Sequence, residues 1–182
     1  VAQVEMRTKR EQDELGVDLK IEGSVIKVIE PTNYTKGTSI AVKNLFFNVP
    51  ARRNFLKSNP VEIKHIVDEF QRTALSYPGI SFQLYQNDLE MYQLSAGKLS
   101  QRIVNIFGGH YKQNLVTCQE ETNDLKITGY IGKPESAKKT RGEQFFFVNS
   151  RYIKSNYLNH AVIDAYEGLL MSETFPFYTL FF

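Results

Sequence analysis

The chain has 182 residues, 42% of them hydrophobic, with 13 Phe and 10 Tyr, and a chain of this size can form one large or two small domains that bury roughly 70% of its unfolded surface. Lys and Arg number 22 against 20 Asp and Glu, so the net charge of +2 is too small to indicate a nucleic-acid binder, and any such function must come from local clusters. The lone Cys118 excludes an internal disulfide framework, and the scattered His65, His110 and His160 lack the spacing of a metal site.

No apolar run is long enough to span a bilayer, and no amino-terminal signal pattern is present, so we expect a soluble intracellular protein without membrane contact. The first residues alternate like a strand, and so do the last, from Phe177 to Phe182. We therefore expect this chain to be a fragment of a longer protein.

The first half of the chain is predicted to form a small antiparallel sheet followed by a helix and a hairpin. Asn59-Pro60-Val61-Glu62 is typical of a helix start, with Asn as the cap, Pro in the first turn and Glu reaching back. Apolar residues then recur at helical spacing as far as Leu75. The predicted strands span residues 1–6, 19–21, 25–29, 37–47, 80–85 and 90–94.

The small, polar segment Ser95-Ala96-Gly97 separates a strand pattern from a helical one and predicts a domain boundary, giving domains over residues 1–97 and 98–182. The second domain is predicted to have helices over 99–107 and 155–170 and strands near 114–118, 125–131, 143–149 and from 177 onward. Strands followed by a helix and a further strand indicate a mixed α/β (α+β) sandwich with helices on one face of the sheet.

Three basic segments are candidates for phosphate contacts. Arg52 and Arg53 follow the turn at Pro50, where internal ion pairing is favoured and a phosphate contact is the alternative. The loop 133–142 carries Lys138, Lys139 and Arg141, and it fits a phosphate contact and a solvated connector equally well.

The third segment, 145–154, is a buried strand that presents Arg151 and Lys154 beyond a turn at Asn149 and Ser150. A rigid strand holds cations at fixed places with little ordering entropy, so Arg151 and Lys154 are the first candidates, and Arg102 on the preceding helix could join them. No hydrolytic motif, phosphate loop or metal motif is present, so no catalytic residue and no metal ligand is assigned.

Three ordered motifs resemble the MutL DNA mismatch-repair family. They are Gly37 to Lys57, with Asn48-Val49-Pro50-Ala51-Arg52-Arg53 at its centre; Arg102-Ile103-Val104-Asn105-Ile106-Phe107-Gly108; and Phe146 to Lys154 with the following Asn159-His160 helix. The resemblance covers the whole chain. It implies the latter part of a GHKL-type ATPase domain in residues 1–97 and most of a ribosomal protein S5 domain 2-like transducer domain in residues 98–182.

The resemblance also implies roles for particular residues. Gly37 and Thr38 match the Gly-Thr motif that closes one side of the family's nucleotide pocket, where glycine permits close backbone approach and Thr offers a hydroxyl. The full-length protein is expected to bind ATP and Mg. The catalytic glutamate, the metal-binding asparagine and the terminal-phosphate lysine of the family have no match here, so no cofactor and no turnover are expected of the fragment alone.

The family implies an ATP-dependent clamp and matchmaker that dimerises, binds double- or single-stranded DNA non-specifically, and recruits repair proteins after a MutS-like mismatch sensor. A second MutL subunit is thus an expected partner, and the expected location is the bacterial cytoplasm at the nucleoid, or the nucleus of a eukaryote. The alternative is a protein-docking module whose cations are structural. A topoisomerase-type transducer is disfavoured by the turn at Asn48 to Arg53.

Overall fold

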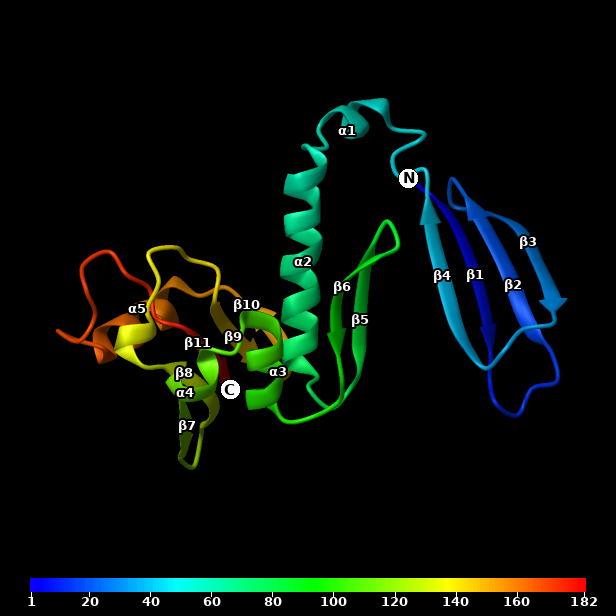
Figure 1. Cartoon of the computed structure of the whole chain (residues 1–182). Helices are drawn as coiled ribbons and strands as arrows, with labels where there is room; N and C mark the ends of the chain where they lie inside the picture. Colours follow the sequence, from blue (N-terminus) through cyan, green and yellow to red (C-terminus); the bar gives the residue numbers. More distant parts are fainter. The chain divides into compact units, whose positions relative to one another are not determined.

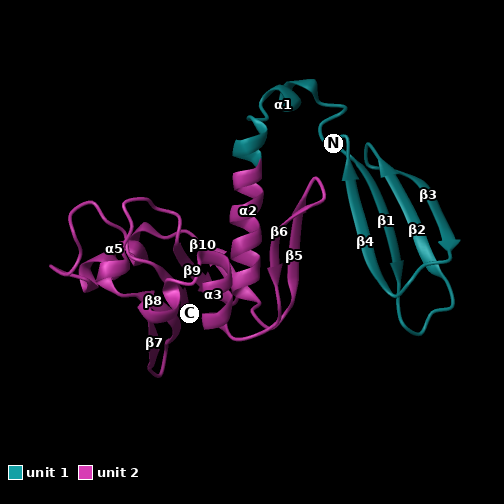
Figure 2. Ribbon diagram, in the orientation of Figure 1, with its two compact units in different colours: residues 1–62 teal, residues 63–182 magenta.

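The computed structural model describes residues 1–182, and these form two compact units, Val1–Glu62 and Ile63–Phe182 (Figure 2). The units are groups of residues that contact one another. They are not a test of the domain boundary expected at residues 95–97, which stays a prediction.

The first unit contains a four-stranded antiparallel sheet in the order β3-β2-β1-β4 (Figure 1). The strands predicted over residues 19–21 and 25–29 are confirmed as parts of the antiparallel β2 and β3, and Gly23 and Ser24 close this hairpin with φ of 55° and 69°, the left-handed backbone that tight turns need. The strands are β1 (Gln3–Lys9), β2 (Gly16–Glu22), β3 (Val25–Thr32) and β4 (Gly37–Lys43).

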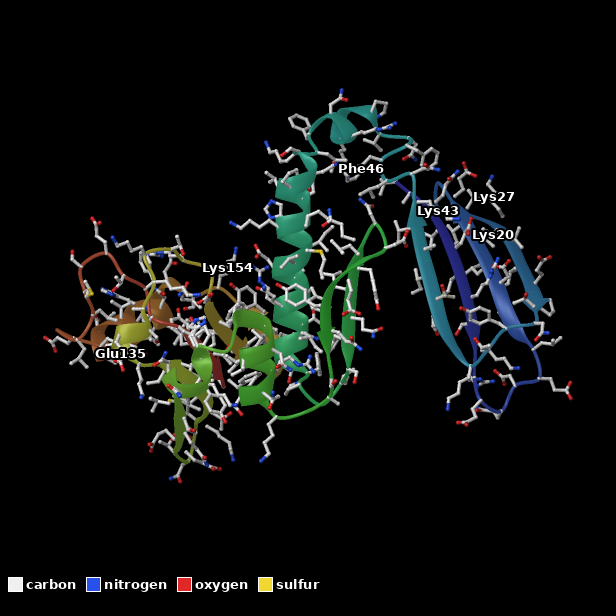
Figure 3. All side chains as sticks on the ribbon, viewed as in Figure 1. Lys20, Lys27, Lys43, Phe46, Glu135 and Lys154 are labelled. Atoms are coloured by element: carbon white, nitrogen blue, oxygen red, sulfur yellow. The ribbon has the colours of Figure 1, made fainter.

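The strand predicted to continue through Phe47 ends at Lys43, so this part of the prediction is wrong. Asn44 and Phe46 have φ of 48° and 62°, and two left-handed residues so close together break an extended backbone despite the aromatic composition. The Phe46 N–H donates to the Val1 carbonyl instead of a strand ladder (Figure 3). The short helix α1 (Pro50–Asn54) then begins with proline in its first turn.

Helix α2 (Asn59–Ser76) begins close to the predicted position, but its capping differs. The N–H groups of Val61 and Glu62 donate to the Ser58 carbonyl, and the Glu62 carboxylate accepts from the Lys57 N–H at 2.7 Å. The glutamate therefore reaches back across the helix start as predicted, with Ser58 in place of Asn59 as the first accepting residue.

The second unit begins within α2 and continues through the predicted β5–β6 hairpin, whose turn has Asn87 and Asp88 at φ of 47° and 64°. Its main sheet has five strands in the order β10-β9-β11-β8-β7, with β11 parallel to β9 and antiparallel to β8. The elements are β5 (Phe82–Gln86), β6 (Leu89–Leu94), α3 (Leu99–Phe107), α4 (Tyr111–Asn114), β7 (Leu115–Glu121), β8 (Lys126–Gly132), the 3₁₀ turn η1 (Pro134–Ser136), β9 (Gln144–Val148), β10 (Arg151–Ile153), α5 (Asn156–Ala165) and β11 (Tyr178–Phe181).

Helix α5 is shorter than the predicted 155–170. It ends at Ala165, where the buried Tyr166 turns its hydroxyl to the Gly132 carbonyl, and Gly168 at φ of 70° prevents the helix from resuming.

Helices cover both faces of the five-stranded sheet, which corrects the expectation of one covered face. Phe145 and Phe147 of β9 pack with α3 and the end of α2, whereas Phe146 packs with Leu158 and Val162 of α5. Successive residues of a strand face opposite sides, so a continuous aromatic run needs apolar cover on both. The core of the second unit thus fixes β9 from both sides.

Candidate nucleic-acid interface

The β9–β10 hairpin presents the two cations that the sequence favoured. Asn149 and Ser150 form the predicted turn with φ of 48° and 62°, and Arg151 is the first residue of the returning strand, opposite Val148. Arg151 and Lys154 are both exposed. Because buried Phe147 pairs with Tyr152, the strand between the two cations is held by the core, as the sequence argument required.

Helix α2 brings a further cation to this hairpin. The Arg72 guanidinium lies 4.2 Å from the centre of the Tyr152 ring, and Ser76 Oγ donates to the Ser150 carbonyl. Stacking on an aromatic ring restrains a guanidinium without using its N–H groups. Arg72 also pairs with the exposed Glu69 on its own helix.

Two neighbouring depressions share Arg72, Tyr152 and Lys154. One, of about 520 Å³, includes Arg151 and the turn residue Ser150. The other, of about 460 Å³, includes Lys64 and Arg141. Lys154, labelled in Figure 3, therefore borders both depressions. Through it the cations of α2, the hairpin and the 133–142 loop adjoin one another. We call Lys64, Arg72, Arg141, Arg151 and Lys154 the basic surface.

Neither Lys64 nor Arg72 was identified from the sequence. They lie eight positions apart with Asp68 midway, and this i, i+4, i+8 spacing places them on one face of α2. The sequence therefore shows that these two cations share a helix face. It does not show that this face lies beside the β9–β10 hairpin.

The loop cations have different surroundings. Lys138 Nζ lies 2.6 Å from Glu143 Oε1, and the Lys138 backbone pairs with Phe175. Tyr111 donates to the other Glu143 oxygen, and burial together with this bond raises the pKa of Tyr111. Lys138 therefore anchors the loop to the fold.

Lys139 is exposed, and the Arg141 guanidinium lies 4.4 Å from the centre of the Phe175 ring. Both side chains thus remain able to reach an anion from this loop.

Arg102 has no access to a ligand, and its predicted phosphate contact is wrong. The side chain is 1% exposed, and its two terminal nitrogens donate to four backbone carbonyls, those of Ala74, Pro78, Ile80 and Ser95, at 2.6–3.2 Å. Burial lowers the pKa of Arg102. The guanidinium instead joins the end of α2, the following turn and the end of β6.

Gly37 and Thr38 lie at the exposed start of β4. Gly37 has a φ of 127°, which favours glycine, and a Cβ there would meet nothing within 4 Å. This open backbone fits the close approach expected of a nucleotide-pocket glycine, whereas Thr38 Oγ1 is shared with Thr8 Oγ1 at 2.7 Å. Their nucleotide contact stays a prediction.

Arg52 and Arg53 lie in the last turn of α1 and make no ion pair, so the predicted internal anchor is absent from this arrangement. No group of three or more His, Cys, Asp or Glu side chains is placed to hold a metal ion. Among the helices, none combines the length and the apolar character needed to cross a membrane.

Comparison with known proteins gives consistent relatives. A family model described as DNA mismatch repair protein, C-terminal domain, matches residues 103–182. The chain is 56% identical over 181 residues to the DNA mismatch repair protein MutL of Christiangramia forsetii and 55% identical to that of Flavobacterium psychrophilum, and each match covers 100% of this chain. The chain spans only 29% and 30% of the length of these relatives.

Solved structures resemble the whole chain. The Aquifex aeolicus MutL ATPase domain complexed with ADP superposes with a TM-score of 0.77 at 23% identity, covering 100% of this chain and 67% of that one. The N-terminal domain of a DNA repair protein gives a TM-score of 0.84 at 19% identity, and the match covers 100% of this chain and 59% of that one. The mixed α/β fold predicted from the sequence is therefore confirmed.

Proposed function

Because the chain belongs to the MutL family of DNA mismatch repair proteins, we propose that it is the part of an ATP-dependent repair clamp that contacts DNA phosphates and relays the nucleotide state. In this proposal the full-length protein binds ATP and Mg, pairs with a second MutL subunit, follows a MutS-like sensor and recruits the next repair proteins. It acts in the bacterial cytoplasm at the nucleoid. The ADP complex of the Aquifex relative supports the nucleotide part.

One observation carries the DNA part of the proposal: Arg72 of α2 lines one depression together with the exposed Arg151 and both depressions together with the exposed Lys154. Cations on rigid elements can follow a phosphate backbone, and such contacts are independent of base sequence. The overall charge of only +2 means that this local surface must supply most of the attraction.

The relay part rests on Arg102. Its four carbonyl acceptors lie near the end of α2, in the turn between α2 and β5 and just after β6, while Arg102 itself lies on α3. A single buried guanidinium thereby couples the segments on both sides of the domain boundary expected at residues 95–97. Displacement of α2 would be transmitted to α3 through these hydrogen bonds.

The DNA contact is tested by charge reversal in the full-length protein. Arg151→Glu with Lys154→Glu should lower duplex affinity and reduce the slope of log K against log salt by about 2, because each lost phosphate contact removes about 0.9. Lys112→Glu is the matched control, since Lys112 is exposed on α4 and lines neither depression. An unchanged slope in the double variant would refute the assignment.

The second candidate is a docking module without direct DNA contact. It is favoured by Lys138 and Arg102, two cations with structural partners. In that case the charge reversals at Arg151, Lys154 and Lys112 would all leave DNA affinity and its salt dependence unchanged. Binding of a second subunit would change instead. The same salt titration therefore separates the two functions.

A further inference from the structure

The depression of about 460 Å³ between α2 and the start of α5 has an unusual excess of positive charge. Four cations and one carboxylate, that of Asp68, line it, and Arg72 also pairs with Glu69 just outside the lining, which leaves a local charge of about +2. The cations come from three separate segments. They are Lys64, Arg72, Arg141 and Lys154.

Two of these cations are oriented by aromatic rings. Arg72 lies over Tyr152 at 4.2 Å, and Arg141 lies over Phe175 at 4.4 Å. Stacking through the face of a guanidinium leaves its N–H edge free of the ring and removes part of the rotamer freedom that binding would otherwise cost. One terminal nitrogen of Arg72 already donates to Glu69, so Arg72 offers a ligand its remaining N–H groups.

The uncharged polar groups in the depression also leave donors. Tyr178 donates its hydroxyl to Asn159 Oδ1 at 2.8 Å, which leaves the Asn159 amide N–H groups for another acceptor. Gln144 is already satisfied, since its oxygen accepts from the Gly142 N–H and its nitrogen donates to the Pro176 carbonyl, both at 2.9 Å. A ligand here meets donors and cations, so it must be rich in acceptors and negatively charged.

The size and charge of the depression distinguish between kinds of phosphate. An internal phosphodiester carries one negative charge and is flanked by nucleosides on both sides, so it meets the rim. A terminal phosphate monoester carries about −1.5 to −2 at neutral pH and has three acceptor oxygens. Within a DNA molecule, only a strand end carries that group.

We propose that this depression, the strand-end cavity, binds the terminal phosphate monoester of a DNA strand. The inference rests on the proposed DNA contact of the basic surface. Because the strand-end cavity shares Arg72, Tyr152 and Lys154 with the depression that holds Arg151, a strand following Arg151 reaches the cavity at its end. The surface would then distinguish a broken strand from a continuous one.

The test measures anisotropy of the full-length protein with one labelled hairpin duplex, prepared with either a 5′-phosphate or a 5′-hydroxyl end, and with the matching 3′ pair. We expect one phosphorylated end to bind about tenfold more tightly, because the monoester makes charged hydrogen bonds that a hydroxyl cannot make. Lys64→Gln and Arg141→Gln should abolish that ratio. Asp68→Asn should increase it, because the variant removes the opposing charge.

Controls separate this inference from the proposed DNA contact. Arg151→Gln should weaken both ends equally and keep the ratio, and Lys112→Gln should change neither. Equal binding of phosphorylated and hydroxyl ends would overturn the strand-end cavity while the DNA contact stands; absence of DNA binding altogether would overturn both. If inorganic phosphate binds without any end preference, the cavity is a free-anion site and the proposal is wrong.

Discussion

The two compact units bury their apolar side chains to very different extents. Every buried hydrophobic residue lies in the second unit, whereas the first unit buries only Gly16 and Asp18. Ile40 and Val42 of β4 are 62% and 61% exposed. Cross-strand pairing aligns them with Met6 and Val4 of β1, so one face of this sheet carries an open apolar patch.

The difference shows what positions the basic surface. A hydrogen-bonded ladder defines the strands of the first unit, but packing around Phe145–Phe147 fixes the β9–β10 hairpin of the second from both faces. Interiors packed in this way allow little displacement. The cations of the basic surface therefore belong to the unit that has the hydrophobic core.

The largest expected effect comes from removing a core side chain of β9. Phe147→Ala should lower the free energy of unfolding of the second unit by about 3–5 kcal/mol, because Phe147 is 0% exposed and leaves a cavity. Urea unfolding followed by circular dichroism measures it. Val148→Ala on the adjacent, exposed position is the control and should cost well under about 1 kcal/mol. Equal costs would contradict the packing described.

Arg102→Met should cost somewhat less, about 3 kcal/mol, because it leaves buried carbonyls without a donor. Hydrogen exchange should rise around residues 74–80, where three of the four acceptors lie. Arg102→Lys keeps the charge but not the forked geometry, so its free energy of unfolding should lie between those of Arg102→Met and the native protein. Unchanged hydrogen exchange in Arg102→Met would contradict the proposed relay between α2 and α3.

A smaller effect is expected at high pH. Burial, with a lesser contribution from Cys118, raises the pKa of Tyr166 from 10.0 to about 12, so the fold favours the neutral phenol. The stabilisation from this shift is present in full below pH 10 and is lost as the pH rises through about 12, roughly 3 kcal/mol in all.

Tyr166→Phe should therefore flatten the decline in urea stability between pH 9 and pH 12. Tyr111 and Tyr178 have pKa values raised mainly by burial too, so part of the decline should persist in the variant. If the stability of the variant declines as steeply as that of the native protein, ionisation of Tyr166 does not destabilise the fold.

The smallest effect is expected in the first unit. Ile40→Ala should change stability by less than about 0.5 kcal/mol, because the side chain loses little buried area. A loss comparable with that of Phe147→Ala, measured in the full-length protein, would show that the apolar face of the β1–β4 sheet is covered there, and the contrast between the units would disappear.

Local chemistry made much of this fold predictable. Gly23-Ser24, Asn87-Asp88 and Asn149-Ser150 form tight turns, and all three pairs have left-handed backbones of the kind their composition favours. The strands that flank these turns were predicted for the same reason. The Leu45–Phe47 cluster shows the limit, since its aromatic composition favours a strand while its backbone is turned by Asn44 and Phe46.

The candidate site was only partly predictable. Arg151 and Lys154 follow a recognisable strand and turn, so their exposure could be expected. Arg102 and Arg72 could not be assigned, because the surroundings of both depend on contacts between segments far apart in the sequence, such as Arg102 with the Ala74 carbonyl and Arg72 with Tyr152. An arginine in an amphipathic helix gives no local sign of whether it faces water or backbone carbonyls.

The most direct measurement is lysine footprinting of the unmodified full-length protein, with acetylation read by mass spectrometry in the presence and absence of duplex DNA at low salt. We expect DNA to protect Lys154 and Lys64 on the basic surface and to leave Lys112 and Lys98 as reactive as before. Equal reactivity of Lys154 with and without DNA, under conditions where the protein is saturated, would contradict this expectation.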